Sequence, residues 1–183
     1  MSLPRRQSGF GLLEIILVIA LVVVAASLAF VIFSSANPSA QSNTEATKLT
    51  TLASSIKGVY GINHDYSGVS NTTVIRGHMV PNDMTPAGNT TDINSLWGAV
   101  EVTPTSINGN ANRGFQVVYR AVPVDACLKF VLGVAPYFPE GVAVGTGTSV
   151  SVLDTRHKVN MTIAIPACQP DGAQDVDVVF IGQ

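Results

Sequence analysis

The feature that most constrains this chain is an apolar run, Leu12 to Phe33, that carries one acid, Glu14, near its start. As a helix rising 1.5 Å per residue, the run is about 33 Å long, which matches a hydrocarbon core of about 30 Å. Arg5 and Arg6 precede it, and no basic residue follows until Lys48. Because basic flanks stay in the cytoplasm, the sequence predicts one membrane-spanning helix with the rest of the chain on the extracytoplasmic side.

An ordinary cleavable signal peptide is the first alternative for this run. Ser34–Ala36 offers a small-x-small cleavage site, but the apolar part of such signals spans only roughly 7–15 residues. A generic signal anchor or a proton-relay helix is the second alternative. An acid inside a bilayer is costly and usually has both a partner and a function. We therefore expect the run to be retained and Glu14 to have a partner.

Beyond the run, the order of elements predicts an α+β fold, with a long N-terminal helix packed on an antiparallel sheet. Beyond the breaker Pro38, one apolar stripe of that helix is predicted from residues spaced three and four apart: Leu49, Leu52, Ala53, Ile56, Val59 and Tyr60. Residues 62–96 are rich in Gly, Asn, Thr, Asp and Pro and predict a long surface connection with one or two helical turns. Strands are expected at 98–104, 114–122, 142–154, 158–165 and 176–181, and a short helix is expected at 124–133.

Composition and motifs argue against most other classes of function. The formal net charge is −2, so there is no basic surface for nucleic acid. The three histidines have no metal-ligand spacing, and the glycine-rich stretch GVAVGTGTS lacks the lysine of a phosphate-binding loop. We therefore expect no catalytic residues, no metal site, no cofactor and no nucleic-acid partner.

The stretch SGFGLLE, Ser8–Glu14, with the apolar helix behind it, resembles the class III signal of type IV pilins. In that family a prepilin peptidase cuts after the glycine, and the apolar helix is kept. The resemblance implies cleavage between Gly9 and Phe10 and N-methylation of Phe10. It also implies that the Glu14 carboxylate meets the Phe10 amine of a neighbouring subunit during assembly, so that two charges costly in an apolar medium neutralise one another.

The resemblance also implies a domain organisation. Residues 1–9 would be a cleaved leader, 10–37 the hydrophobic membrane and assembly helix, 38–61 its amphipathic half, and 62–183 a globular head. Within the head, 62–96 would be the connection and 97–183 the sheet with a cysteine-bracketed region.

The function implied is a structural subunit of a type IV pilus, a homo-oligomeric helical filament for adhesion, aggregation or DNA transfer. Its partners would be the prepilin peptidase, the pilus assembly machinery and a host or bacterial surface. Before assembly the subunit would lie in the inner membrane with its head in the periplasm; afterwards it would be in the extracellular pilus. The alternatives are a pseudopilin of a type II secretion system and a minor pilin.

The two cysteines, Cys127 and Cys168, follow the export segment. An oxidising compartment favours one disulfide between them over two buried thiols. The pair resembles the disulfide-bounded region of pilin heads, and the surrounding VPVDACLKF and ACQPDG are most like type IVb pilins of the bundle-forming and conjugative thin-pilus kinds. The short leader and Phe10 are more like type IVa pilins, so the subclass is open.

Overall fold

The computed structural model describes residues 12–183, without the side chains at 12–14, 21 and 24–37. The chain divides into two compact units, Met1–Asn37 and Pro38–Gln183. The first helix, α1 (Leu12–Tyr60), belongs to both units and contains Pro38. A proline inside a helix costs about 3 kcal/mol, because it has no backbone N–H to donate to the preceding turn, and this residue also opens the second unit.

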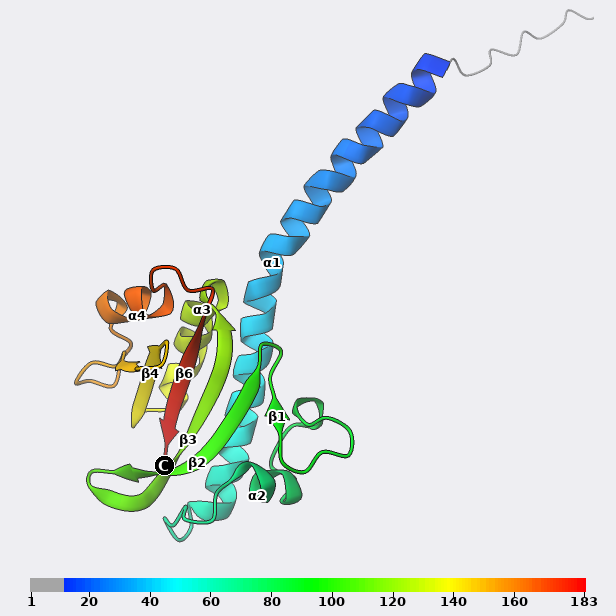
Figure 1. The fold of residues 1–183 in the computed structure, drawn as a ribbon. Coiled ribbons are helices and arrows are strands. Elements are labelled where there is room, and N and C mark those ends of the chain that lie inside the picture. The colour runs from blue at the N-terminus through cyan, green and yellow to red at the C-terminus, as the bar shows by residue number, and fades with distance from the viewer. Residues whose placement is uncertain (1–11) are drawn as a thin grey trace, which may run out of the picture. The chain divides into compact units, whose positions relative to one another are not determined.

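The strands of the described residues form a six-stranded antiparallel sheet with the order β1-β2-β3-β6-β4-β5. They are β1 (Ile93–Asn94), β2 (Ala99–Ile107), β3 (Asn110–Pro123), β4 (Gly141–Gly145), β5 (Val150–Ser151) and β6 (Asp175–Gly182). Asn108 and Gly109 connect β2 to β3, and both have positive φ, as a tight hairpin turn requires. The C-terminal strand β6 lies between β3 and β4 (Figure 1).

Short helices complete the part of the fold that the structure describes. They are α2 (Asn71–Arg76), α3 (Val124–Val134) and α4 (Met161–Cys168), with 3₁₀ turns η1 (Asn82–Met84) and η2 (Ala135–Tyr137). The helix expected at 124–133 is confirmed as α3, whose Phe130 and Val131 are fully buried. The expected α+β class is confirmed as well.

The hydrophobic core lies between the C-terminal part of α1 and the sheet. Leu49, Leu52 and Ile56 of α1 have no exposed surface and Ala53 is 3% exposed, and Tyr60 packs partly buried against the core, which confirms these members of the predicted stripe. The prediction was wrong for Val59, which is 54% exposed, because at 100° per residue it lies to the side of the stripe while Tyr60 returns to its centre. The buried residues belong to one cluster with side chains of β2, β3, β4, β6 and α3. Within it the ring of Phe180 lies 5.3 Å from that of Phe130 and 5.2 Å from that of Phe138, so aromatic packing joins α3 and the residue that follows η2 to β6.

Two of the predicted strands have a different structure. Residues 158–165 were expected as a strand, but α4 begins at Met161. Asn160 caps this helix, because its side-chain oxygen accepts a hydrogen bond from the Thr162 N–H at 3.1 Å. The strand expected at 142–154 is instead the hairpin of β4 and β5, which turns at Gly147 with φ of 79°. Alternating apolar residues fit a strand in both places. The cap at Asn160 instead starts a helix, and the turn at Gly147 divides the other segment into two strands.

The predicted surface connection at 62–96 contributes to the core. Its single apolar side chains Tyr66, Val74, Met84 and Ile93 are at most 1% exposed. They are spaced too widely to give a helical or strand period, so the sequence does not predict their burial. The connection is thus a packed layer that contains α2 and η1.

The Asn71 side chain takes the place of a neighbouring strand at one edge of the sheet. Its amide nitrogen donates to the Val100 carbonyl at 3.0 Å, and its oxygen accepts from the Val102 N–H at 2.7 Å. These two bonds satisfy backbone groups of β2 that an open edge would leave available for pairing with another chain.

A buried carboxylate, Glu45, fastens α1 to the loop before β2. Its side chain has no exposed surface, and its Oε1 accepts from the Leu96 N–H at 3.3 Å and from Lys48 Nζ at 3.0 Å. Lys48 also pairs with Asp83 at 2.7 Å. Because a buried charge is costly unless it is paired and hydrogen-bonded, this network favours one rotation of α1 against the loop.

The expected disulfide is confirmed. Cys127 of α3 is bonded to Cys168 at the end of α4, across a sequence separation of 41, and both residues are fully buried. The bond ties together two helices that lie on either side of the β4–β5 hairpin in the sequence.

Replacing both cysteines by alanine should lower the free energy of unfolding by about 4 kcal/mol, because the unfolded chain regains the entropy that the closed loop removes. Urea unfolding can be followed by the fluorescence of Trp97, the single tryptophan of the sequence. Reduced wild-type protein should show the same loss, and the double variant should be insensitive to reductant. An unfolding midpoint that reduction leaves unchanged would contradict the prediction.

Glu45→Ala should lower the free energy of unfolding by about 2–3 kcal/mol, because the Leu96 N–H loses its acceptor. Glu101→Ala is the matched control, since Glu101 forms an exposed ion pair with Arg120 and such pairs contribute less than about 1 kcal/mol. The same urea unfolding experiment compares the two variants. Equal losses would mean that the buried network does not have the stabilising role described here.

Candidate functional site

The residues predicted for processing and assembly lie at the start of the chain. Gly9 and Phe10 lie outside the described residues. Glu14 lies in α1, but its side chain is outside the described set. Cleavage after Gly9, methylation of Phe10 and pairing by Glu14 therefore stay predictions.

The first unit presents apolar side chains all around α1 where they are described. Ile15 to Ile19, Val22 and Val23 are each between 51% and 60% exposed. A helix that is apolar on every side needs to be covered, either by lipid or by other helices. This stretch is therefore a candidate contact surface.

Within the described part of the chain, no helix is both long enough and apolar enough to cross a membrane. The predicted span, Leu12–Phe33, falls largely on residues whose side chains are outside the described set.

The second candidate site is the region between the bonded cysteines, which carries η2, β4, β5 and α4. The disulfide fixes both of its ends, and β4 joins it to the sheet through β6. Val142, Val144, Val152 and Ala164 of this region are at most 1% exposed. The region is therefore a firmly packed part of the head, and its loops are held in defined positions.

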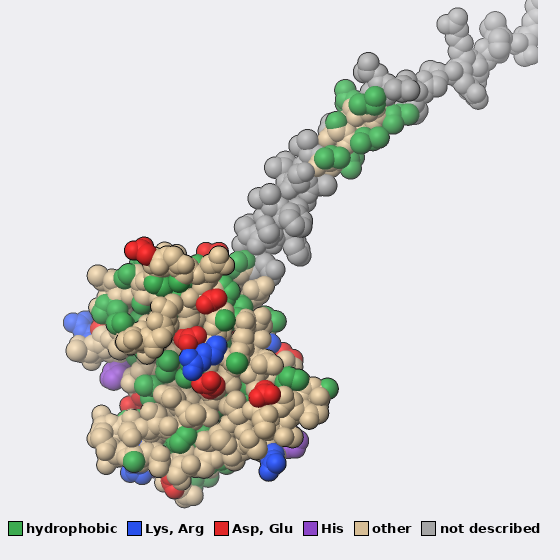
Figure 2. Space-filling model, in the orientation of Figure 1, with side chains coloured by type: hydrophobic (Ala, Val, Ile, Leu, Met, Phe, Trp, Pro, Cys, Tyr) green, Lys and Arg blue, Asp and Glu red, His purple; other side chains and the backbone are tan. Residues whose placement is uncertain are grey.

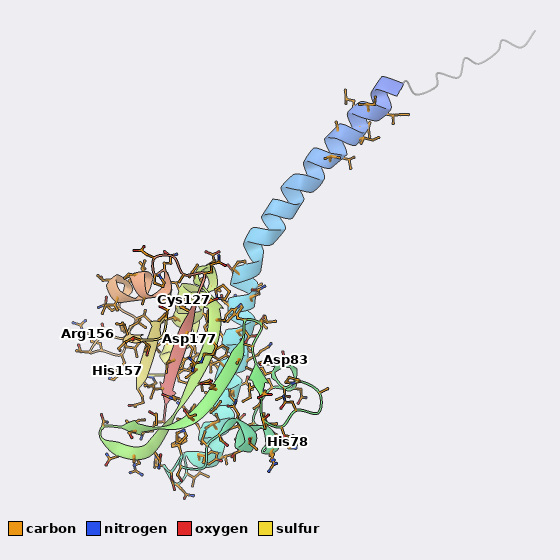
Figure 3. The ribbon with its side chains drawn as sticks, viewed as in Figure 1. His78, Asp83, Cys127, Arg156, His157 and Asp177 are labelled. Carbon is orange, nitrogen blue, oxygen red and sulfur yellow. A yellow bond between two sulfur atoms is a disulfide. The ribbon has the colours of Figure 1, made fainter. Side chains whose placement is uncertain are left out.

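One of these loops, between β5 and α4, folds around Asp154. The Oδ1 atom of Asp154 accepts hydrogen bonds from the backbone N–H groups of Arg156 at 2.8 Å and Lys158 at 2.9 Å. These bonds, that of Lys158 first, lower the pKa of the Asp154 carboxyl. Arg156, His157 and Lys158 are exposed, and Figure 3 shows Arg156 and His157 projecting from this loop.

On the open face of the sheet, Arg120 joins two acids. Its guanidinium lies 2.6 Å from Asp177 Oδ2 and 2.9 Å from Glu101 Oε2, and these bonds, first that to Asp177, raise its pKa. Figure 2 shows basic atoms beside acidic ones in the middle of this face. Ala121, with φ of 55°, lies in the irregular stretch of β3 that turns Arg120 toward both partners. The described residues contain no cluster of three or more metal-ligating side chains.

Sequence reasoning missed two polar residues that the structure makes important. Glu45 lies four residues before Leu49 and seven before Leu52, so the spacing that predicts the apolar stripe also places an acid on the buried side. Burial, and then the charge of Glu45, raises the pKa of Tyr119 well above its usual range. For Asn71 the sequence carries no such signal, because its role depends on where β2 comes to lie.

Comparison with known proteins identifies the family. The family model described as PilS N terminal matches residues 39–182. The model of the prokaryotic N-terminal methylation motif matches residues 4–30. No sequence among the curated proteins matches the chain.

Two solved structures are similar to the chain. TcpA, a type IV pilin from Vibrio cholerae El Tor biotype, is 16% identical with a TM-score of 0.51, covering 82% of this chain and 99% of that one. The type IVb pilin PilS from Salmonella typhi is 19% identical with a TM-score of 0.44, covering 77% of this chain and 96% of that one. The likeness to TcpA shows the fold.

The resemblance read from Ser8–Glu14 is thus confirmed at the level of the family. The matches do not favour the alternatives of a secretion pseudopilin or a minor pilin. With the PilS model covering most of the chain and the methylation motif in front of it, the chain belongs to the PilS family of type IV pilins, which are structural subunits of pili.

Proposed function

We propose that this pilin polymerises through its N-terminal helix into an extracellular homopolymeric filament. The observation that carries the proposal is the order of the two family matches, with the methylation motif at 4–30 directly before the pilin region at 39–182. The exposed apolar side chains of Ile15–Ile19 support it. They would be covered by lipid before assembly and by neighbouring helices in the filament.

Before assembly, the subunit would be held in the inner membrane with its head in the periplasm. Arg5 and Arg6 on the cytoplasmic side and the absence of basic residues until Lys48 support this orientation. A prepilin peptidase would cut between Gly9 and Phe10, and the new amine of Phe10 would be methylated. The pilus assembly machinery would then extract the subunit into the growing filament.

In the filament, the Glu14 carboxylate would pair with the Phe10 amine of a neighbouring subunit. An unpaired charge in an apolar surrounding is strongly unfavourable, whereas two opposite charges with good geometry offset each other's desolvation. The pairing would therefore select one register between adjacent helices.

The head would form the outer surface of the filament and act in adhesion, aggregation or DNA transfer between cells. We assign it a structural rather than an enzymatic role, and the type IVb subclass, whose sequence around Cys127 and Cys168 this chain resembles. The disulfide and the packed region that it bounds support a role as a surface that stays folded outside the cell.

The mature chain should begin at Phe10 with a methylated amine, because the motif places the cleaved bond directly after Gly9. Intact-mass analysis of exported protein would measure this. Gly9→Val, which puts a branched side chain at the cleaved bond, should leave the leader in place. A mature chain that begins after Ala36 would show ordinary signal cleavage and end the proposal.

Glu14→Ala should leave cleavage and head folding intact but sharply reduce filaments, while membrane-held subunit accumulates. In the filament, the incoming Phe10 amine would lose its counter-charge, and breaking a buried pair costs about 3–5 kcal/mol. Glu14→Gln, which is nearly isosteric and keeps a hydrogen-bond acceptor, should be less severe. Immunoblots of sheared filaments and of membranes measure both pools. A normal filament yield from Glu14→Ala would refute the pairing.

A further inference from the structure

A pocket of about 460 Å³ lies on the disulfide-bounded side of the head, where η2 meets the segment that leads into α4. Its volume is in the range of small-molecule sites, about 300–1,000 Å³. The residues that line it are Leu132, Ala135, Pro136, His157, Lys158, Val159 and Met161. All of them belong to the second compact unit, so the pocket does not depend on the filament proposed above.

Most of the lining is apolar and open to water. Leu132 is 43% exposed and Met161 is 41% exposed, which is high for side chains of this size. Covering apolar surface contributes about 25 cal/mol per Å², and a methionine side chain adapts readily to what it covers. The lining therefore suits the apolar part of a ligand.

The rest of the lining is basic. Lys158 and His157 belong to it, and Arg156 is their neighbour in the same loop. Asp154, the acid of this loop, is bonded to the backbone N–H groups of Arg156 and Lys158. His157 is fixed by a hydrogen bond from its Nδ1 to the Pro139 carbonyl. The described lining includes no acidic side chain. The Asp154 carboxylate attracts Lys158, but Arg156 and Lys158 together leave the loop with a net positive charge, which complements a negative one.

The surface view agrees with this arrangement. At the place where Figure 3 labels Arg156 and His157, Figure 2 shows basic and histidine side chains beside apolar ones. A neutral apolar ligand would leave the Lys158 ammonium unused, and a cationic ligand would be repelled by it. A ligand with both an apolar and an anionic part uses the whole lining.

We infer that this pocket binds a small anionic amphiphile, that is, a carboxylate or phosphate group on a compact apolar body. The anionic group meets Lys158, and the apolar body lies against Leu132 and Met161. Nothing in the pilin family match or in the filament proposal assigns a ligand to this region.

Methyl NMR of methionine-labelled full-length protein in zwitterionic lipid nanodiscs tests the site. Met161 lines the pocket, whereas Met79 and Met84 are buried in the core at 8% and 0% exposure and serve as internal references. The probes are hexanoate, hexanol and hexylammonium, which share one apolar chain and differ in charge. We expect hexanoate to shift the Met161 methyl signal saturably and hexylammonium to bind about fivefold or more weakly.

Two variants separate the pocket from general surface charge. Lys158→Gln should raise the Kd for hexanoate about fivefold while leaving the weaker binding of hexanol unchanged. Lys129→Gln is the control, because Lys129 is a basic residue of α3 outside the lining, and it should change neither Kd. Unchanged Met79 and Met84 signals would verify that both variants are folded.

Four results would overturn the inference. They are no shift at Met161 with hexanoate, equal binding of the three probes, equal shifts at Met161, Met79 and Met84, and an effect of Lys129→Gln as large as that of Lys158→Gln. The first result would mean that the pocket takes part of a macromolecule, such as a side chain of another protein, and not a small amphiphile. Each of the other three results would mean that the probes adsorb unspecifically to the protein surface.

Discussion

The second unit depends on the burial of one side of α1 against the sheet. Leu49, Leu52 and Ile56 lose all contact with water there, and the same cluster collects side chains from five strands and from α3. Polar contacts then fix the placement of α1, which the apolar stripe alone does not determine. Glu45 binds the Leu96 N–H, and Trp97 Nε1 donates to Gln41 Oε1 at 3.4 Å. Apolar burial supplies most of the stabilisation, and these few directional bonds select one placement of the helix.

Much of this fold could be predicted from the sequence, because several of its elements have a strong hydrophobic period and simple boundaries. The stripe of α1, the helix α3 and the hairpin of β2 and β3 each have a local signal in the sequence. The burial of Tyr66 and Ile93 had none, since single apolar residues in a polar segment show no period. The helix α4 was mistaken for a strand because its residues alternate, and the cap at Asn160 outweighed that pattern. The disulfide followed from compartment and resemblance, but the pocket beside α4 depends on how distant segments meet and has no sequence signal.

The helix α1 carries two acids for which one physical rule applies. Glu45 is fully buried in the head, with Lys48 and the Leu96 N–H as partners in its own chain. Glu14 lies in the apolar part, where we propose that the partner comes from another chain. A carboxylate in an apolar surrounding is tolerated only with an opposite charge, so Glu45 specifies a position more than it adds stability, and Glu14 would do the same in the filament. Glu45 fixes the position of α1 within the monomer, and Glu14 would fix the register between subunits of the filament.

The place of β6 in the sheet has a consequence for how the head is made. This strand is the last regular element of the chain, yet it pairs with β3 on one side and with β4 on the other. The β4–β5 hairpin therefore cannot join the rest of the sheet until β6 has been synthesised. Because pairing between distant segments forms late, the emerging head stays incomplete up to its last strand. The strand β6 closes the sheet, and a chain without it would lack the centre of its sheet, with two open edges, of β3 and β4, exposed to aggregation.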